Sequence, residues 1–352
     1  MSKPEQAAFP DTICAVSWQD GGIKMLDQRL LPARERYLQL DTAPGVADAI
    51  REMAIRGAPA IGIAAAYGVV LAARKAYQRA GGEWRTEIEP CLQQLVSARP
   101  TAVNLEWAIE RMRRVFPRIE DNPENSLLHE AQAIHEEDRA ANRRMGALGA
   151  GIIKDTRSVL THCNTGSLAT GGYGTALGVI RTAFANHTLA MVYASETRPW
   201  LQGARLTVWE LAREKIPVTL IADSAVGYLM RTGRLGWVIV GADRIAANGD
   251  VANKIGTYSH AVNARHHGIG FMVVAPLSSI DPTTLSGDDI PIEQRPSSEL
   301  IYFAGDTVTP FTVNACNPVF DITPAGLIDV IVTEKGVVHD PDEKKIMGLL
   351  ED

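Results

Sequence analysis

Short apolar runs rich in β-branched residues alternate with amphipathic stretches along the second half of the chain. Runs of this length are typical of buried strands, and the stretches between them have the periodicity of helices that cover a sheet. The alternation predicts an α/β fold with a Rossmann-like, mostly parallel sheet flanked by helices on both faces. The strands are expected at residues 158–161, 188–194, 217–222, 237–241 and 269–275, and the helices at residues 175–184, 203–215, 225–231 and 258–267.

The first half of the chain has mainly helical periodicity. A strand-like segment at residues 13–18, followed by a Gly21-Gly22 turn, is the exception. The helices are expected at residues 47–54 and 59–76, which are rich in alanine, and at residues 103–115 and 127–148, which are amphipathic and charged.

Length and composition indicate two globular domains. The 352 residues exceed the ~250–300 that one core commonly reaches, and 46% of them are hydrophobic. The polar, proline-containing segment at residues 120–126 predicts the boundary. We expect a small, mainly helical N-terminal domain with a few strands at residues 1–125 and a Rossmann-like catalytic domain at residues 126–352.

Charge and cysteine usage exclude several function classes. The net charge of −6 disfavours a nucleic-acid or acidic membrane partner. The sequence shows neither an apolar run of ~18 residues nor a signal-peptide pattern, so we expect a cytoplasmic protein without a membrane span. The four cysteines are too far apart for a disulfide framework or a zinc site, so no metal is expected; they are Cys14, Cys91, Cys163 and Cys316.

One of these cysteines stands where the first predicted strand of the sheet ends. Cys163 opens the loop Cys-Asn-Thr-Gly-Ser-Leu-Ala-Thr-Gly-Gly-Tyr-Gly at residues 163–174. Such a loop exposes backbone N–H groups that suit an anion, and a thiol at its mouth can act as an acid, a base or a nucleophile. The alternative is that Cys163 is only a small buried residue.

Polar residues also follow the other predicted strands, and the carboxyl ends of parallel strands are where ligands bind. Asp223 follows the third strand directly, and we expect it to cap the next helix. Asp243 follows the fourth strand and precedes a long loop of Ala, Asn and Gly that ends in Asn253-Lys254. A cap is therefore a poor explanation of Asp243.

Two arginines in the N-terminal half precede prolines. In Arg56-Gly57-Ala58-Pro59 the arginine stands just before a helix expected to begin at the proline, beside exposed N–H groups that suit a phosphate. Arg99 repeats the arrangement before Pro100. The alternative for Arg56 is a solvated arginine at a helix–helix corner.

Together these motifs resemble those of the methylthioribose-1-phosphate isomerases. That family shares its fold with the regulatory subunits of a eukaryotic translation-initiation nucleotide-exchange factor. The resemblance spans roughly residues 50–320 and rests on Arg-Gly-Ala-Pro-Ala-Ile-Gly at 56–62, Ser-Ala-Arg-Pro-Thr-Ala-Val-Asn at 97–104, Thr-His-Cys-Asn-Thr-Gly at 161–166, Glu-Thr-Arg-Pro at 196–199 with Gln-Gly at 202–203, and Gly-Ala-Asp-Arg-Ile-Ala at 241–246 with Asn-Lys-Ile-Gly-Thr at 253–257.

The resemblance implies an aldose–ketose isomerase of methionine salvage, which converts 5-methylthioribose 1-phosphate into 5-methylthioribulose 1-phosphate. It implies Cys163 and Asp243 as the catalytic pair, a homodimer, and no cofactor. The implied substrate-binding residues are Arg56, Gly57, Ala58, Arg99, Gln202, Asn253 and Lys254. The sequence does not choose between a proton-transfer route, in which Cys163 removes the C2 proton, and a hydride shift that Cys163 only assists.

Three alternatives stay open at this stage. Gly172, Gly174 and Gly178, followed by Glu196, approach a dinucleotide-binding fingerprint, but the spacing is one residue too long. A non-catalytic regulatory subunit of the same fold is the second. The third is an isomerase of 5-deoxyribose 1-phosphate or ribose 1,5-bisphosphate.

Overall fold

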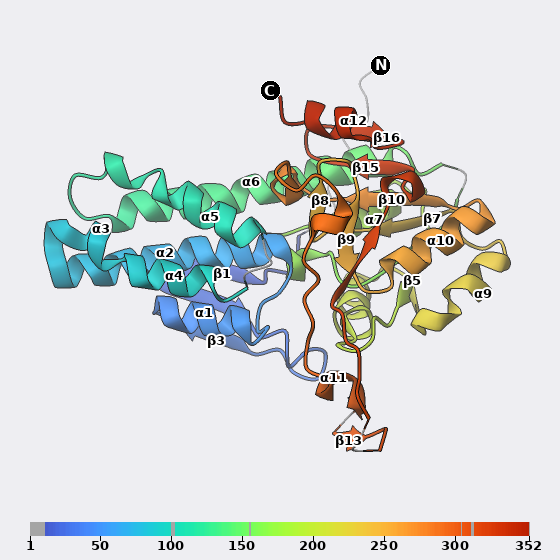
Figure 1. Ribbon diagram of the computed structural model, residues 1–352, viewed down its shortest axis with the longest axis horizontal. Coiled ribbons are helices and arrows are strands. Elements are labelled where there is room, and N and C mark those ends of the chain that lie inside the picture. The colour runs from blue at the N-terminus through green and yellow to red at the C-terminus, as the bar shows by residue number, and fades with distance from the viewer. Residues whose placement is uncertain (1–10, 100–102, 155, 304, 311–312, 352) are drawn as a thin grey trace. The chain divides into compact units, whose positions relative to one another are not determined.

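The computed structural model describes residues 11–99, 103–154, 156–303, 305–310 and 313–351 (Figure 1). The chain forms two compact units. Unit 1 comprises Met1–Ala147 and Asn164–Thr182, and unit 2 comprises Leu148–Cys163 and Ala183–Asp352. The expected boundary between residues 125 and 126 falls at the start of a 27-residue helix. The division into two functional domains between residues 125 and 126 stays a prediction.

Unit 1 is a helical bundle with a small antiparallel sheet. The sheet has the order β1-β2-β3, so the single strand-like segment expected from the sequence is one strand of three. Figure 1 shows α2 and α5 side by side, and they pack against each other. The elements are β1 (Val16–Gln19), β2 (Gly22–Leu26), β3 (Tyr37–Leu40), α1 (Ala43–Arg51), α2 (Ala58–Ala80), α3 (Trp84–Glu87), α4 (Glu89–Val96), α5 (Val103–Arg113) and α6 (Glu124–Ala150).

Helix α2 is the centre of the unit 1 core. It is apolar on every side because neighbouring elements surround it, and most of its residues are buried. Together with α3, over Ala58–Glu87, it is long and apolar enough by length and composition alone to cross a membrane. Since 83% of the apolar window is buried inside the unit, a core helix accounts for the same pattern.

Unit 2 contains the expected parallel sheet. Its strand order is β16-β15-β10-β7-β4-β5-β6, and all neighbours pair in parallel except the edge strand β16. The five expected strands are all present within a few residues of their predicted bounds. The strands are β4 (Ser158–Thr161), β5 (Met191–Ser195), β6 (Val218–Ile221), β7 (Trp237–Val240), β10 (Gly270–Val274), β15 (Val330–Val332) and β16 (Val337–His339).

The helices between these strands also lie where the periodicity places them. Helix α10 packs against β7 and β10, and α8 packs against β6. The stretch expected as one helix at residues 203–215 begins with a π-helical turn, Gly203–Thr207. The helices are α7 (Ala176–Ala185), α8 (Val208–Arg213), α9 (Val226–Arg231), α10 (Thr257–His267), α11 (Ser298–Ile301) and α12 (Glu343–Gly348).

A second sheet corrects the expectation of a long loop after Asp243. Strands β8 (Arg244–Ala246) and β9 (Val251–Lys254) form an antiparallel hairpin there. The hairpin is extended into the order β11-β8-β9-β14 by β11 (Ile280–Asp281) and β14 (Phe320–Thr323). The Asn and Gly residues form the hairpin turn, and partners far along the chain stabilise the strands. A two-stranded pair, β12 (Tyr302–Phe303) with β13 (Asp306–Thr307), stands apart from both sheets.

Candidate active site

Cys163 lies just beyond the carboxyl end of β4, in the middle of the parallel sheet. Its side chain is buried, and its backbone has a φ of +61°, a left-handed conformation that β-carbon-bearing residues avoid. Two threonines hold it there: the Cys163 N–H donates to Thr197 Oγ1 at 3.0 Å, and Thr207 Oγ1 donates to the Cys163 carbonyl at 2.5 Å. Such imposed backbone strain clusters at functional sites.

Thr197 is itself strained and is held by a carboxylate. Its φ is +66°, and its N–H donates to Asp223 Oδ1 at 2.8 Å, while the next N–H, of Arg198, donates to Asp223 Oδ2 at 2.7 Å. The expectation that Asp223 caps its own helix is therefore wrong. The carboxylate instead joins the end of β6 to the loop after β5, because two successive N–H groups of that loop donate to it.

Asp243 lies after β7, the neighbour of β4 in the sheet. It is half-buried, and its N–H donates to the Ala252 carbonyl at 2.9 Å, at the open end of the β8–β9 hairpin. From β4 the chain adds β5 and β6 toward one edge of the sheet. It then returns to the other side of β4 and adds β7, β10 and β15 toward the opposite edge. Cys163 and Asp243 therefore flank the point where the strand order reverses, which is where open α/β sheets bind ligands.

Gln202 follows β5 and is buried, with 6% of its surface exposed. Its Oε1 has no hydrogen-bond partner among the described residues, although a buried amide oxygen normally has one. The next residue, Gly203, packs directly on the strand end: a Cβ there would stand 1.7 Å from the Ser195 carbonyl oxygen. The close approach fixes the backbone beside Gln202.

Asn253 and Lys254 end β9, opposite Asp321 and Phe320 of β14. Asn253 is buried and its Nδ2 donates to Thr257 Oγ1 at 3.0 Å, while Lys254 Nζ lies 5.0 Å from the centre of the Phe320 ring. Asp321 accepts hydrogen bonds from the Gly256 and Tyr258 N–H groups at the start of α10. Burial raises the pKa of the Asp321 carboxyl to about 6.

The residue before Cys163 has its ring in a buried polar cluster. His162 Nε2 lies 2.9 Å from the Ile255 carbonyl, and its Nδ1 lies 2.6 Å from Ser195 Oγ and 3.3 Å from His260 Nε2. Burial lowers the pKa of both imidazoles. Because Ile255 follows Lys254, one side chain joins the strand end that carries Cys163 to the strand end that carries Lys254.

In unit 1, Arg56 is buried rather than solvated, so the helix-corner alternative is wrong. Its Nη1 donates to the Asn164 carbonyl at 2.9 Å, its Nη2 to Asn164 Oδ1, and its Nε to Gln28 Oε1 at 3.3 Å. Arg56 thus anchors the residue that follows Cys163 in the chain. Any contact with phosphate would be an additional role.

Gly57 and Ala58 form the start of α2. Gly57 has a φ of +93°, and a Cβ there would stand 2.5 Å from the Ala169 Cβ, so the glycine-rich loop packs against the helix start. The first N–H groups of a helix this long carry no intrahelical bond and suit an anion. Arg99 is half-buried in the turn after α4, and the adjoining Pro100, Thr101 and Ala102 lie outside the described residues.

Three residues of α6 that no sequence motif indicated hold the glycine-rich loop. His135 Nε2 donates to the Gly171 carbonyl at 2.8 Å, Gly171 N–H donates to Asp138 Oδ2 at 2.7 Å, and Asn142 Nδ2 donates to the Gly172 carbonyl at 3.0 Å. Their spacing of three and four residues puts them on one face of α6. A polar stripe at that spacing was the available signal.

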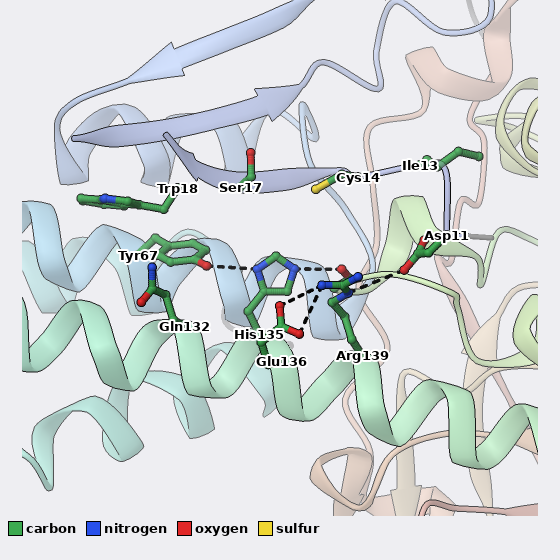
Figure 2. Close-up of a pocket in the computed structure, with 11 residues that line it drawn as sticks. Asp11, Ile13, Cys14, Ser17, Trp18, Tyr67, Gln132, His135, Glu136 and Arg139 are labelled. Atoms are coloured by element: carbon green, nitrogen blue, oxygen red, sulfur yellow. Dashed lines mark hydrogen bonds and ion pairs between the residues drawn. The ribbon is translucent and has the colours of Figure 1, made fainter. Parts of the chain in front are cut away.

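A pocket of about 430 Å³ lies in unit 1, lined by α6, Tyr67 of α2 and the chain around β1. Figure 2 shows Tyr67 and His135 side by side among the lining side chains, with Tyr67 Oη 3.0 Å from His135 Nδ1. Its charged groups are paired with one another, since Arg139 meets both Glu136 and Asp11. None of the site residues predicted from the sequence lines it.

Comparisons with known proteins identify the family of the chain. The Initiation factor 2 subunit family matches residues 54–340. The methylthioribose-1-phosphate isomerase of Thioalkalivibrio sulfidiphilus is 58% identical over 99% of both chains. Among solved structures, the 5-methylthioribose 1-phosphate isomerase of Pyrococcus horikoshii has a TM-score of 0.90 and 42% identity, covering 97% of each chain.

A further solved structure is named differently. The translation initiation factor eIF-2B, subunit delta, from A. fulgidus has a TM-score of 0.86 and 42% identity over 97% of this chain and all of its own. Several relatives named methylthioribose-1-phosphate isomerase have higher identity than this, for example 59% in Methylococcus capsulatus over 93% of both chains. The chain therefore belongs to the Initiation factor 2 subunit family and, within it, to the methylthioribose-1-phosphate isomerases.

Proposed function

We propose that this chain is an aldose–ketose isomerase that converts 5-methylthio-α-D-ribose 1-phosphate into 5-methylthio-D-ribulose 1-phosphate in methionine salvage. The names of its isomerase relatives support the substrate. The observation that carries the proposal is the placement of a strained, buried thiol and a carboxyl group on either side of the strand-order reversal.

Asp243 is the proposed acid that opens the sugar ring. The substrate carries its phosphate on the anomeric carbon, so it cannot open spontaneously to a free aldehyde. A proton from Asp243 passes to the ring oxygen while the bond from that oxygen to C1 breaks. The resulting Asp243 carboxylate later takes the proton of the C2 hydroxyl as the ketone forms, so that it ends the cycle protonated.

Cys163 is proposed to act at C2, where two routes are chemically balanced. In the proton-transfer route its thiolate removes the C2 proton to form the cis-enol 1-phosphate, the resulting thiol exchanges its proton with solvent, and it then gives a proton to C1. In the hydride-shift route hydrogen moves from C2 to C1 with its electron pair, and Cys163 only stabilises the transition state. Turnover in D₂O separates them, because deuterium at C1 of the product requires the proton-transfer route.

The remaining predicted residues are proposed to bind the substrate. Gln202, Asn253 and Lys254 belong to unit 2, and the unpartnered Oε1 of Gln202 supports its part. Arg56, Gly57, Ala58 and Arg99 belong to unit 1, where the start of α2 supports a role in phosphate binding. Neither a metal nor a cofactor is part of the proposal.

The decisive experiment incubates the purified chain separately with the 5-methylthio, 5-deoxy and 5-phospho forms of ribose 1-phosphate. The proposal expects the highest kcat/KM with the methylthio sugar. Preference for either other sugar would assign the corresponding alternative isomerase. No turnover of any of the three would favour a non-catalytic subunit of the same fold, and the A. fulgidus structure of that fold is named a translation initiation factor subunit.

We further propose a homodimer in the cytoplasm. The homodimer follows from the family resemblance, and sedimentation or light scattering of the purified chain measures it directly. Fractionation of the source cells tests the compartment.

A further inference from the structure

The hydrogen bonds around His162 determine its tautomer. The Ile255 carbonyl accepts only, so Nε2 must carry the proton of that 2.9 Å hydrogen bond. Nδ1 is then an acceptor, which fits hydrogen bonds donated by the Ser195 hydroxyl and by the His260 Nε2–H. The same assignment leaves His260 Nδ1 without a proton, and that atom is buried without a partner among the described residues.

This ring joins segments that are far apart in the chain. It extends from β4, contacts the last residue of β5 through Ser195, contacts α10 through His260, and donates to the carbonyl that follows Lys254. It also lies against Gly256, where a Cβ would stand 3.3 Å from the His162 Cε1 and Nε2. The close packing leaves the ring a single position.

We propose that His162 is a positioning residue: its Nε2-protonated ring fixes the backbone of Cys163 relative to that of Lys254. The inference rests on the proposed function, since it assigns Cys163 to chemistry and Lys254 to substrate binding. A ring that merely fills space would contribute to stability and to neither kinetic constant.

Substitutions at His162 distinguish a positioning role from a space-filling role. His162→Phe keeps a planar ring but leaves the Ile255 carbonyl unsatisfied, and we expect kcat to fall about tenfold or more and KM to rise severalfold. His162→Gln keeps an N–H that can reach the Ile255 carbonyl, so we expect KM to recover to within about threefold of the wild type. Val273→Ala, which truncates a buried side chain of β10, is the control. We expect it to lower the melting temperature about as much as His162→Phe does, while kcat and KM stay unchanged.

Unchanged kcat and KM in His162→Phe would overturn the proposal, as would equal losses in Val273→Ala. A wild-type chain that turns over none of the three sugars would instead remove the proposed function. Nitrogen NMR of ¹⁵N-histidine-labelled wild-type protein needs neither activity nor a folded variant. We expect His162 to be protonated on Nε2 alone at pH 7.5, since burial lowers the pKa of its imidazole beside Asp223, Lys254 and His260. A proton on Nδ1 would overturn the tautomer on which the proposal is built.

Discussion

At the scale of single residues, the site is built on backbone positions that side chains normally avoid. Cys163 and Thr197, at the ends of neighbouring strands, both have positive φ, and each such residue costs about 1–3 kcal/mol unless its surroundings impose it. The surroundings here are three hydrogen bonds, from Thr207 to Cys163, from Cys163 to Thr197, and from Thr197 to Asp223. The thiol is therefore held at a fixed place by groups outside the reaction.

Cys163→Ala and Asp243→Asn are expected to lower kcat by at least about 10²–10⁴, since each removes a proposed acid–base group. Neither change alters the backbone hydrogen bonds that hold Cys163 and Asp243 in place, so both variants should fold and unfold cooperatively. Steady-state kinetics and thermal unfolding test both statements. Full activity in either variant would remove that residue from the mechanism.

Gln202→Leu is expected to raise KM about tenfold while kcat stays within about threefold of the wild type, because a uniform binding contact is lost. The melting temperature should not fall, since the buried Oε1 loses no partner within the described part of the chain. The combination is diagnostic. A structural glutamine would instead give a lower melting temperature and an unchanged KM.

The candidate site residues and their positions at strand and helix ends could be predicted from the sequence, whereas their hydrogen-bond partners could not. Asp223 has the sequence position of a helix cap, yet its two acceptors bind the loop of the adjacent strand. Arg56 was placed beside a helix start correctly, but its bonds to Asn164 connect residues 108 positions apart. Such pairings depend on tertiary packing, which local pattern does not encode.

At the scale of elements, predictability followed the length and burial of each segment. The strands of the parallel sheet are continuous apolar runs, so β4 and β10 were located within a residue or two. Strands β8 and β9 are three or four residues long and contain Ala, Asn and Lys, which have little strand propensity. They are strands because partners far along the chain pair with them: β14, which lies 66 residues beyond β9, pairs with β9, and β11 pairs with β8.

Gly203→Ala is expected to destabilise the protein by more than about 3 kcal/mol, because the added Cβ meets backbone at 1.7 Å rather than a movable side chain. Activity should fall as well, since the loop after β5 carries Gln202 and Thr197. Gly348→Ala in α12 is the matched control, with open space around the new Cβ. Urea unfolding of both variants is the measurement. A Gly203→Ala variant as stable as the control would show that this loop can move away from β5.

At the scale of the whole molecule, buried titratable groups set the response to pH, and they act in opposite directions. Burial lowers the pKa of His135, His162 and His260, so unfolding at acidic pH takes up protons that the folded state excludes. Their contribution to stability is complete above pH 6.5 and is lost as the pH falls. Asp321 is the opposite case: with its pKa raised to about 6, it favours the folded state at low pH and loses that effect as the pH rises through 6.

The number of groups on each side predicts the sign between pH 7 and pH 5. Three buried histidines with lowered pKa values, His260 well below its usual value, lose stability over this range, whereas Asp321 alone returns about 1 kcal/mol. We therefore expect the free energy of unfolding, measured in urea, to fall on acidification. Carboxyl groups with lowered pKa values, such as Glu89, act mainly below this range. Asp321→Asn should make the fall steeper by about 1 kcal/mol, whatever its effect at pH 7, because it removes a carboxyl group whose titration opposes that of the histidines. A wild-type protein that gains stability between pH 7 and pH 5 would mean that the buried imidazoles take up protons without unfolding.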